Sequence, residues 1–199
     1  MRSKGTIALV IIGLLVLVGG CGGVSSYNSM VQQQEQVRQA WANVESNYQR
    51  RADLIPNLVR TVQGAADFEQ ETLTNVTEAR ARATSVQISA EDLENPEQLQ
   101  RYQQAQGELG QALGRLLMVS ENYPALRATE QFQTLQAQLE GTENRINVAR
   151  RDYNQAVSEY NTQIRSFPTN IIAGVTGFNT RPQFEAEQGA EQAPSVNFD

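Results

Sequence analysis

Apolar residues return every seven positions through much of this chain, which places them on one face of an α-helix. The longest series consists of Phe132, Leu139, Ile146, Tyr153, Tyr160 and Phe167. A second series, in the first third of the chain, consists of Trp41, Tyr48, Ile55 and Val62. Aromatic residues make up only 7% of the chain, which also favours a narrow helical core over a β-sandwich.

Three long helices are predicted from this pattern and from the prolines. The first covers residues 29–83, the second 96–121 and the third 125–167. Pro56 falls inside the first helix, where a proline removes one backbone hydrogen bond and clashes with the carbonyl four residues earlier. Because the apolar series keeps its phase across Pro56, we expect a bent helix and not a stop. Pro168 ends the third helix.

The expected fold is all-α: an elongated antiparallel bundle of three to four long helices with an N-terminal hydrophobic anchor. In an up-down-up arrangement the first and third helices run parallel. The predicted divisions are a signal peptide or membrane anchor, the helical bundle, an apolar C-terminal segment and an acidic disordered tail. They cover residues 1–24, 27–168, 169–182 and 183–199, respectively.

The N-terminus carries Arg2 and Lys4, an apolar run at 6–18, and Cys21, the only cysteine. In one interpretation it is a lipoprotein signal peptide, in which Val18-Gly19-Gly20-Cys21 is a lipobox and Cys21 becomes lipidated. In the other, residues 6 to about 24 form an uncleaved membrane anchor, although a span takes about 20 apolar residues. Both interpretations leave the positive end in the cytoplasm and the following domain outside it.

Residues 171–178 form an apolar segment that contrasts with the acidic stretch after residue 183. Two interpretations of this segment remain open. It either folds back onto the bundle or exposes an apolar patch that contacts a membrane or a partner.

Composition excludes several classes of function. The net charge is −6, so the chain repels phosphate backbones and nucleic acid is not an expected partner. With no histidine and one cysteine, a Cys/His zinc site, a Ser–His–Asp triad and a Glu-x-x-His di-iron centre are all excluded. A narrow bundle also leaves little room for the carboxylate pair of a glycosidase. We therefore expect no enzymatic activity, no cofactor, no metal and no small-molecule substrate.

Two arginine pairs with nearby acidic residues are the candidate site. The residues are Arg50, Arg51, Asp53, Glu143, Arg150, Arg151 and Asp152. Arg51 falls on the apolar face of the first helix, and a buried arginine requires carboxylate partners. If the first and third helices run parallel, the two arginine pairs lie at a similar position along the bundle axis. They then form either an interhelical salt-bridge layer or an anion site for a group such as a lipid headgroup.

Several segments resemble signatures of the LemA family. They are WANVE at 41–45, YQRRADLIPNLV at 48–59, ENYP at 121–124, LEGTENRI at 139–146 and ARRDYN at 149–154. The resemblance is collinear from about Tyr27 to Phe184. It implies an antiparallel helical bundle, membrane association and no known enzymatic activity. Many members carry a plain membrane helix, whereas here Cys21 lies at the position of a lipobox cysteine.

The sequence thus predicts a non-enzymatic, membrane-anchored envelope protein that acts as a structural or protein-interaction scaffold. Its expected partners are the membrane, through the N-terminus, and other envelope proteins, including copies of itself. The alternative is a lipid-contacting or membrane-remodelling protein that uses the apolar C-terminal segment.

Overall fold

The computed structural model describes residues 2–64, 68–89 and 92–185, with side chains from Gly22 onward. All regular structure within these ranges is helical, which confirms the predicted all-α class. The elements are α1 (Arg2–Gln63), α2 (Gln70–Ser85), η1 (Asp92–Glu94), α3 (Pro96–Ser120), α4 (Pro124–Arg127), α5 (Glu130–Arg165) and α6 (Thr169–Thr176). The predicted anchor, with its lipidation site Cys21, lies almost wholly outside the residues whose side chains are described.

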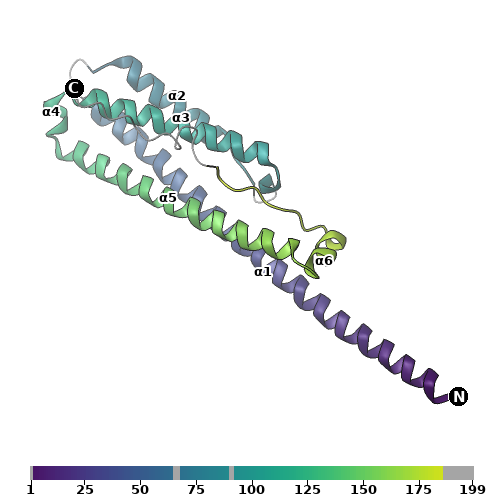
Figure 1. The fold of residues 1–199 in the computed structure, drawn as a ribbon. Coiled ribbons are helices and arrows are strands. Elements are labelled where there is room, and N and C mark those ends of the chain that lie inside the picture. Colours follow the sequence, from purple (N-terminus) through teal and green to yellow (C-terminus); the bar gives the residue numbers. More distant parts are fainter. Residues whose placement is uncertain (1, 65–67, 90–91, 186–199) are drawn as a thin grey trace, which may run out of the picture.

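The long helices form two antiparallel pairs that lie side by side, α1 with α5 and α2 with α3 (Figure 1). Gln163 of α5 bonds to Ser29 of α1 at 2.6 Å, while Arg51 of α1 reaches Glu143 of α5 at 2.9 Å, so residue numbers rise along one helix as they fall along the other. Beyond α6, only α1 continues toward the N-terminus. Among the described side chains, no helix combines the length and apolarity that crossing a membrane requires.

The predicted first helix, 29–83, is in fact two helices. α1 passes through Pro56, as expected, but ends at Gln63, and α2 begins at Gln70 and turns back along the body. The break does not disturb the spacing of apolar residues, because Val62 and Leu73, both buried, are eleven residues apart. Eleven residues equal about three helical turns, so the apolar phase continues as if the helix did.

The extra reversal corrects the predicted arrangement. Because α2 returns along α1, the helix α5 runs antiparallel to α1, and the expectation that these two helices are parallel is wrong. The predicted second helix corresponds to α3, where Asn95 caps the start by accepting from the amide N of Glu97 at 3.0 Å. The predicted third helix is interrupted near its start, since the short α4 precedes α5.

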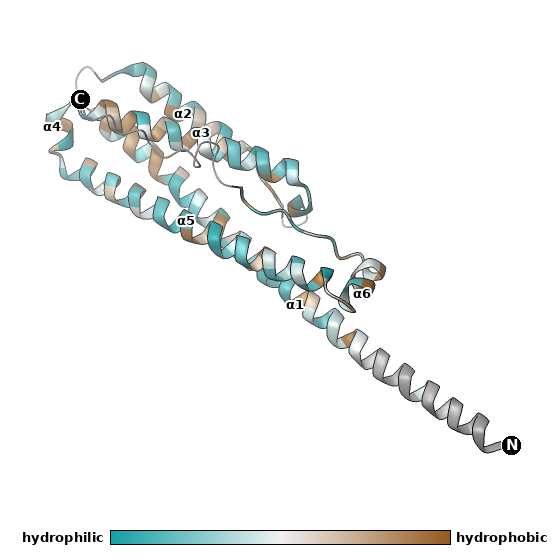
Figure 2. Cartoon of the chain, viewed as in Figure 1, coloured by the Kyte–Doolittle hydropathy of each residue, from teal (hydrophilic) through white to brown (hydrophobic). Residues whose placement is uncertain are grey.

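The core consists of two clusters stacked along the body. The cluster nearer α6, which we call the aromatic cluster, combines aliphatic residues with most of the buried aromatic ones, including Trp41, Tyr153, Tyr160 and Phe184. The cluster at the opposite end is mainly aliphatic, and Leu58, Leu109, Leu116 and Phe132 are among its members. Figure 2 shows polar residues over much of the outer face of the helices, as expected for helices with one apolar face.

The C-terminal part of the chain folds back onto the body. Ala173 of α6 is buried, and α6 contacts both α1 and α5. The chain then leaves α6 at Gly177, whose φ of 80° is a left-handed conformation that glycine adopts without strain. Residues 178–185, which we call the strap, continue without regular structure, and Phe184 is buried in the aromatic cluster. Residues 183–185 of the predicted tail thus belong to the strap, and residues 186–199 lie outside the described residues.

Candidate functional site: a buried arginine and the strap

Arg51 connects three helices at the centre of the body. Its side chain is only 5% exposed, and its Nη1 donates to Oε2 of Glu143 on α5 at 2.9 Å. Its Nη2 donates to the backbone oxygen and to Oε1 of Gln106 on α3, each at 2.9 Å. The guanidinium also lies 5.0 Å from the ring centre of Tyr48. The apolar pattern correctly indicated that Arg51 faces inward, but Gln106 gave no signal in the sequence.

The other members of the predicted charge layer do not join Arg51 and Glu143. The exposed residues are Arg50, Asp53, Arg151 and Asp152. Asp53 accepts from Gln49 on its own helix at 2.8 Å. Arg150 lies over the ring of Phe184 at 5.0 Å and donates to the backbone oxygen of Glu185. The two arginine pairs are therefore separate, because α1 and α5 are antiparallel and their numbering runs in opposite directions.

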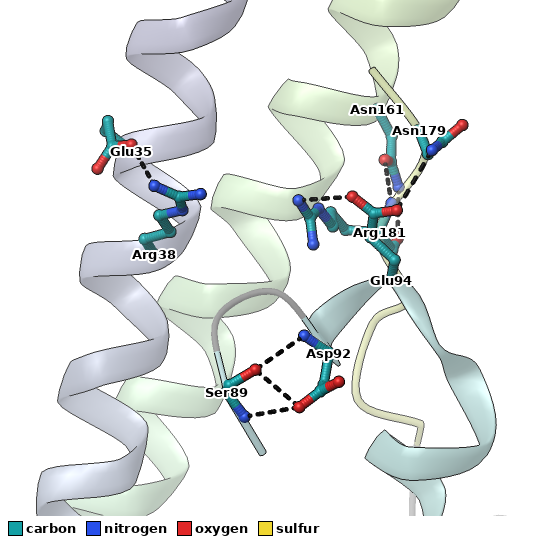
Figure 3. A network of polar contacts seen from close by, with 8 residues as sticks. All are labelled: Glu35, Arg38, Ser89, Asp92, Glu94, Asn161, Asn179 and Arg181. Atoms are coloured by element: carbon teal, nitrogen blue, oxygen red, sulfur yellow. Dashed lines mark hydrogen bonds and ion pairs between the residues drawn. The ribbon is translucent and has the colours of Figure 1, made fainter. Parts of the chain in front are cut away.

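A second buried arginine, Arg181, lies in the strap and was not anticipated. Its side chain is 4% exposed, and its Nη2 lies 3.0 Å from Oε1 of Glu94 in η1. Asn179, also in the strap, donates to the other oxygen of Glu94 at 3.2 Å. Figure 3 shows both strap residues meeting this one carboxylate. Glu94 thus fixes the strap to the connection between α2 and α3.

Two asparagines of α5 hold the backbone of the strap. Asn161 donates from Nδ2 to the carbonyl oxygen of Arg181 at 2.8 Å and accepts from its amide N at 2.9 Å. Asn154 makes the same two bonds to Phe184, at 3.0 and 2.8 Å. Each side-chain amide therefore pairs with a strap residue as a neighbouring β-strand would.

The spacing of these asparagines explains why the pairing fits. Asn154 and Asn161 are seven residues apart, so they share a face of α5 and differ in height by about 10 Å. Arg181 and Phe184 are three residues apart, and three extended residues also cover about 10 Å. The strap runs antiparallel to α5. One sequence signal for this pairing is the Tyr-Asn pair that occurs at 153–154 and again at 160–161.

Aromatic side chains lie beneath the strap. Trp41 stacks on Phe184 with ring centres 6.0 Å apart, and Tyr153 meets the same ring edge-on at 5.4 Å. The hydroxyl of Tyr153 donates to the backbone oxygen of Pro182 at 3.1 Å. Burial raises the pKa of Tyr153, of Tyr102 and of Tyr160 above the ordinary value for tyrosine. These groups stay neutral at physiological pH, so they serve as packing and hydrogen-bonding groups.

A metal centre requires several ligating side chains close together. Within the described ranges, no three carboxylate or thiol groups are placed to hold a metal ion. A partly open groove at the far end of the body is bordered by Leu117, Met118 and Arg127. What the geometry provides is a set of fixed contacts between helices and a docked strap.

Comparison with known proteins decides the family. The sequence model of the LemA family matches residues 40–198, most of the chain. The chain belongs to the LemA family. The match extends beyond α5 and includes the strap. The resemblance seen in the sequence motifs is confirmed.

This LemA-family chain is similar in sequence to three known proteins along most of its length. It is 29% identical to the magnetosome proteins MamQ 1 and MamQ 2 of Paramagnetospirillum magneticum, over 95% of its own length and 75% of theirs. It is 23% identical to protein LemA of Metamycoplasma hominis, over 75% of its own length and 64% of that protein's. Neither the LemA nor the MamQ name denotes an enzymatic activity.

Proposed function

We propose that this LemA-family protein is a non-enzymatic scaffold of the cell envelope, anchored to a membrane by its N-terminus. The observation that carries the proposal is the continuity of α1. One helix of 62 residues includes both the apolar N-terminal run and the part of α1 that packs in the helical body. At 1.5 Å per residue this helix is about 90 Å long. The body is therefore joined to the anchor by a helix and not by a flexible linker.

The contacts of the body support a role in binding rather than catalysis. Arg51 and Arg181, the two buried charged side chains among the described residues, use guanidinium donors to join helices and the strap. A catalytic group would instead face a cleft that admits a substrate. The exposed surface of the rod is open to contact by other envelope proteins or by a second copy of the chain.

Both forms of anchor remain compatible with this function. A lipidated Cys21 would hold the body by acyl chains, whereas an uncleaved helix would hold it by a span of the bilayer. Either anchor leaves the body on the outer side of the membrane, given Arg2 and Lys4 at the N-terminus. The relatives named as magnetosome proteins support an association with a membrane-related structure.

Mass spectrometry of the intact mature protein from its own membranes tests the anchor, beside a Cys21→Ala variant. A chain that begins at Cys21 and carries acyl mass, lost in the variant, identifies a lipoprotein. A full-length chain in the membrane fraction identifies a span. A mature chain that lacks both the apolar run and acyl mass, and that stays in the soluble fraction, would refute membrane anchoring.

Protease treatment of intact spheroplasts tests the orientation. The proposal requires the body to be cut from outside, after the outer membrane, where one is present, has been opened. A body that is cut only after the cytoplasmic membrane is lysed would place it in the cytoplasm and refute the envelope assignment.

A further inference from the structure

Three large apolar side chains near α6 face solvent instead of the core. Ile171 is 60% exposed and Val175 is 85% exposed, and they lie four residues apart on one face of α6. Phe167, in the turn before α6, is 81% exposed. The opposite side of α6 carries Ala173, which is buried. We call the set Phe167, Ile171 and Val175 the α6 stripe.

The α6 stripe lies at the end of the body from which α1 extends toward its apolar run (Figures 1 and 2). Tyr27 of α1 meets Phe178, just after α6, with ring centres 5.6 Å apart. Ser29 of α1 bonds to Gln163, in the last turn of α5 before α6. α6 therefore lies beside residues 24–30 of α1, where Val24 is also 63% exposed.

Two segments at this end of the body contain no charged residue, in contrast to the rest of an acidic protein. Residues 5–34 and 166–180 contain no Asp, Glu, Lys or Arg. A surface without carboxylates is not repelled by anionic headgroups, and it has no ion to desolvate when it approaches acyl chains. The exposed apolar side chains and the missing charges therefore fit the same partner, a lipid surface.

Both anchors set α6 at the height of the lipid headgroups, and this step rests on the proposed membrane anchoring. The hydrocarbon core of a bilayer takes about 20 helical residues. Residues 5–24 form an uncharged run of that length, so a spanning helix leaves the core near Val24. Tyr27 is then about 5 Å further on, within the headgroup layer. If Cys21 is acylated instead, Tyr27 is about 9 Å from the lipid attachment.

We infer that the α6 stripe, together with Val24, inserts into the headgroup region of the bilayer that holds the N-terminus. The contact buries the exposed side chains of Phe167, Ile171 and Val175, and it gives the body a second attachment beside α1. Short amphipathic helices lie at this depth, about 5–10 Å into the boundary between headgroups and acyl chains. With two attachments, the body keeps one inclination to the membrane instead of pivoting about α1.

Fluorescence quenching by brominated lipids tests the contact in the full chain. The protein is reconstituted into vesicles of phosphatidylcholine and phosphatidylglycerol with bromine on the acyl chains. The single tryptophan, Trp41, is buried and supplies the background signal. Ile171→Trp adds a probe to the α6 stripe, and Met118→Trp adds a matched probe at the far end of the body, where Met118 is 69% exposed.

We expect the fluorescence that Ile171→Trp adds to be largely quenched by the brominated lipid, and the fluorescence that Met118→Trp adds to be unaffected. Val175→Trp replaces Ile171→Trp if circular dichroism shows that the first variant does not fold. Equal, weak quenching of both probes would overturn the inference. Protection of the stripe probe from both brominated lipid and aqueous iodide would overturn it too, because a protein, such as a second copy, would then cover the stripe.

Flotation of the vesicles separates this inference from the proposed function. If the full chain does not float with the vesicles, membrane anchoring and the α6 contact both fail. If it floats but the stripe probe is not quenched, the anchor stands and only the α6 contact is refuted.

Discussion

Arg80 of α2 donates from Nε to the backbone oxygen of Ala52 in α1, at 2.8 Å. Pro56, four residues after Ala52, has no N–H and cannot supply the helical hydrogen bond to that oxygen. Ala52 is buried, so its oxygen would otherwise lack a partner at a substantial cost. Arg80 thus replaces the missing donor, which explains how α1 continues through a proline.

Replacing Arg80 should therefore destabilise the fold, because the hydrogen bond that Pro56 cannot make is then no longer replaced. We expect Arg80→Met to lower the free energy of unfolding by about 1–3 kcal/mol, because a buried carbonyl loses its donor. In a Pro56→Ala background the same change should cost less, since an alanine at this position has an N–H that can donate to the oxygen of Ala52. Urea unfolding of the wild type, of the two single variants and of the double variant completes this double-mutant cycle. Equal costs in both backgrounds would contradict the compensation.

Arg51 gives a second stability prediction. Arg51→Ala removes the donors to Gln106 and leaves a space in the core, so we expect a loss of about 3 kcal/mol or more. Glu143 is 51% exposed, so Glu143→Gln should cost less than about 1 kcal/mol. Thermal or urea unfolding measures both. A larger effect for Glu143→Gln would mean that the ion pair, and not the contacts with Gln106, stabilises the layer.

The asparagine pairing of the strap is testable by hydrogen exchange. In Asn161→Leu, the amide N–H of Arg181 loses its acceptor, so its exchange should speed up by at least about tenfold while α1 and α5 stay protected. Asn144→Leu is the matched control, because Asn144 is an exposed asparagine of the same helix. Unchanged exchange of Arg181 in Asn161→Leu would show that other contacts hold the strap.

Stability should fall at alkaline pH. Burial raises the pKa of Tyr102 and Tyr153 in the folded state above their unfolded value of about 10. Below that pH both states are neutral and the full stability is present; above it, only the unfolded chain readily loses the proton, so stability declines as pH rises. The urea midpoint should therefore drop above about pH 10. Tyr102→Phe should reduce the drop, and an identical pH profile in that variant would contradict this origin.

The sequence predicted those parts of the fold that depend on helical periodicity. Phe132, Tyr153 and Tyr160 of the seven-residue series are all buried along α5. Phe167, the last member, is exposed because α5 ends at Arg165, two residues before it. Periodicity describes a face only while the helix continues, and it does not mark where the helix stops.

The parts that were missed depend on contacts that leave no periodic trace. The break after α1 kept the apolar phase, so the direction of α5 relative to α1 was predicted wrongly. The strap has few apolar residues, and side-chain amides of Asn154 and Asn161 pair with its backbone, which any residue type can supply. Arg51 was identified because it interrupts the apolar face of a helix. Arg181 lies in the strap, where no helical pattern of apolar residues exists.

The docked strap also fixes the distance of Glu185, an acidic side chain at its end, from the membrane. It carries the chain from α6 back to Glu185, whose backbone oxygen accepts from Arg150, thirteen residues before Gln163 along α5. That interval equals about 20 Å of helix. In the proposed orientation, Glu185 therefore lies more than two Debye lengths from the headgroups, since that length is about 8 Å in physiological salt. At this distance ions screen the repulsion between Glu185 and anionic lipid, so this carboxylate does not oppose the approach of α6 to the membrane.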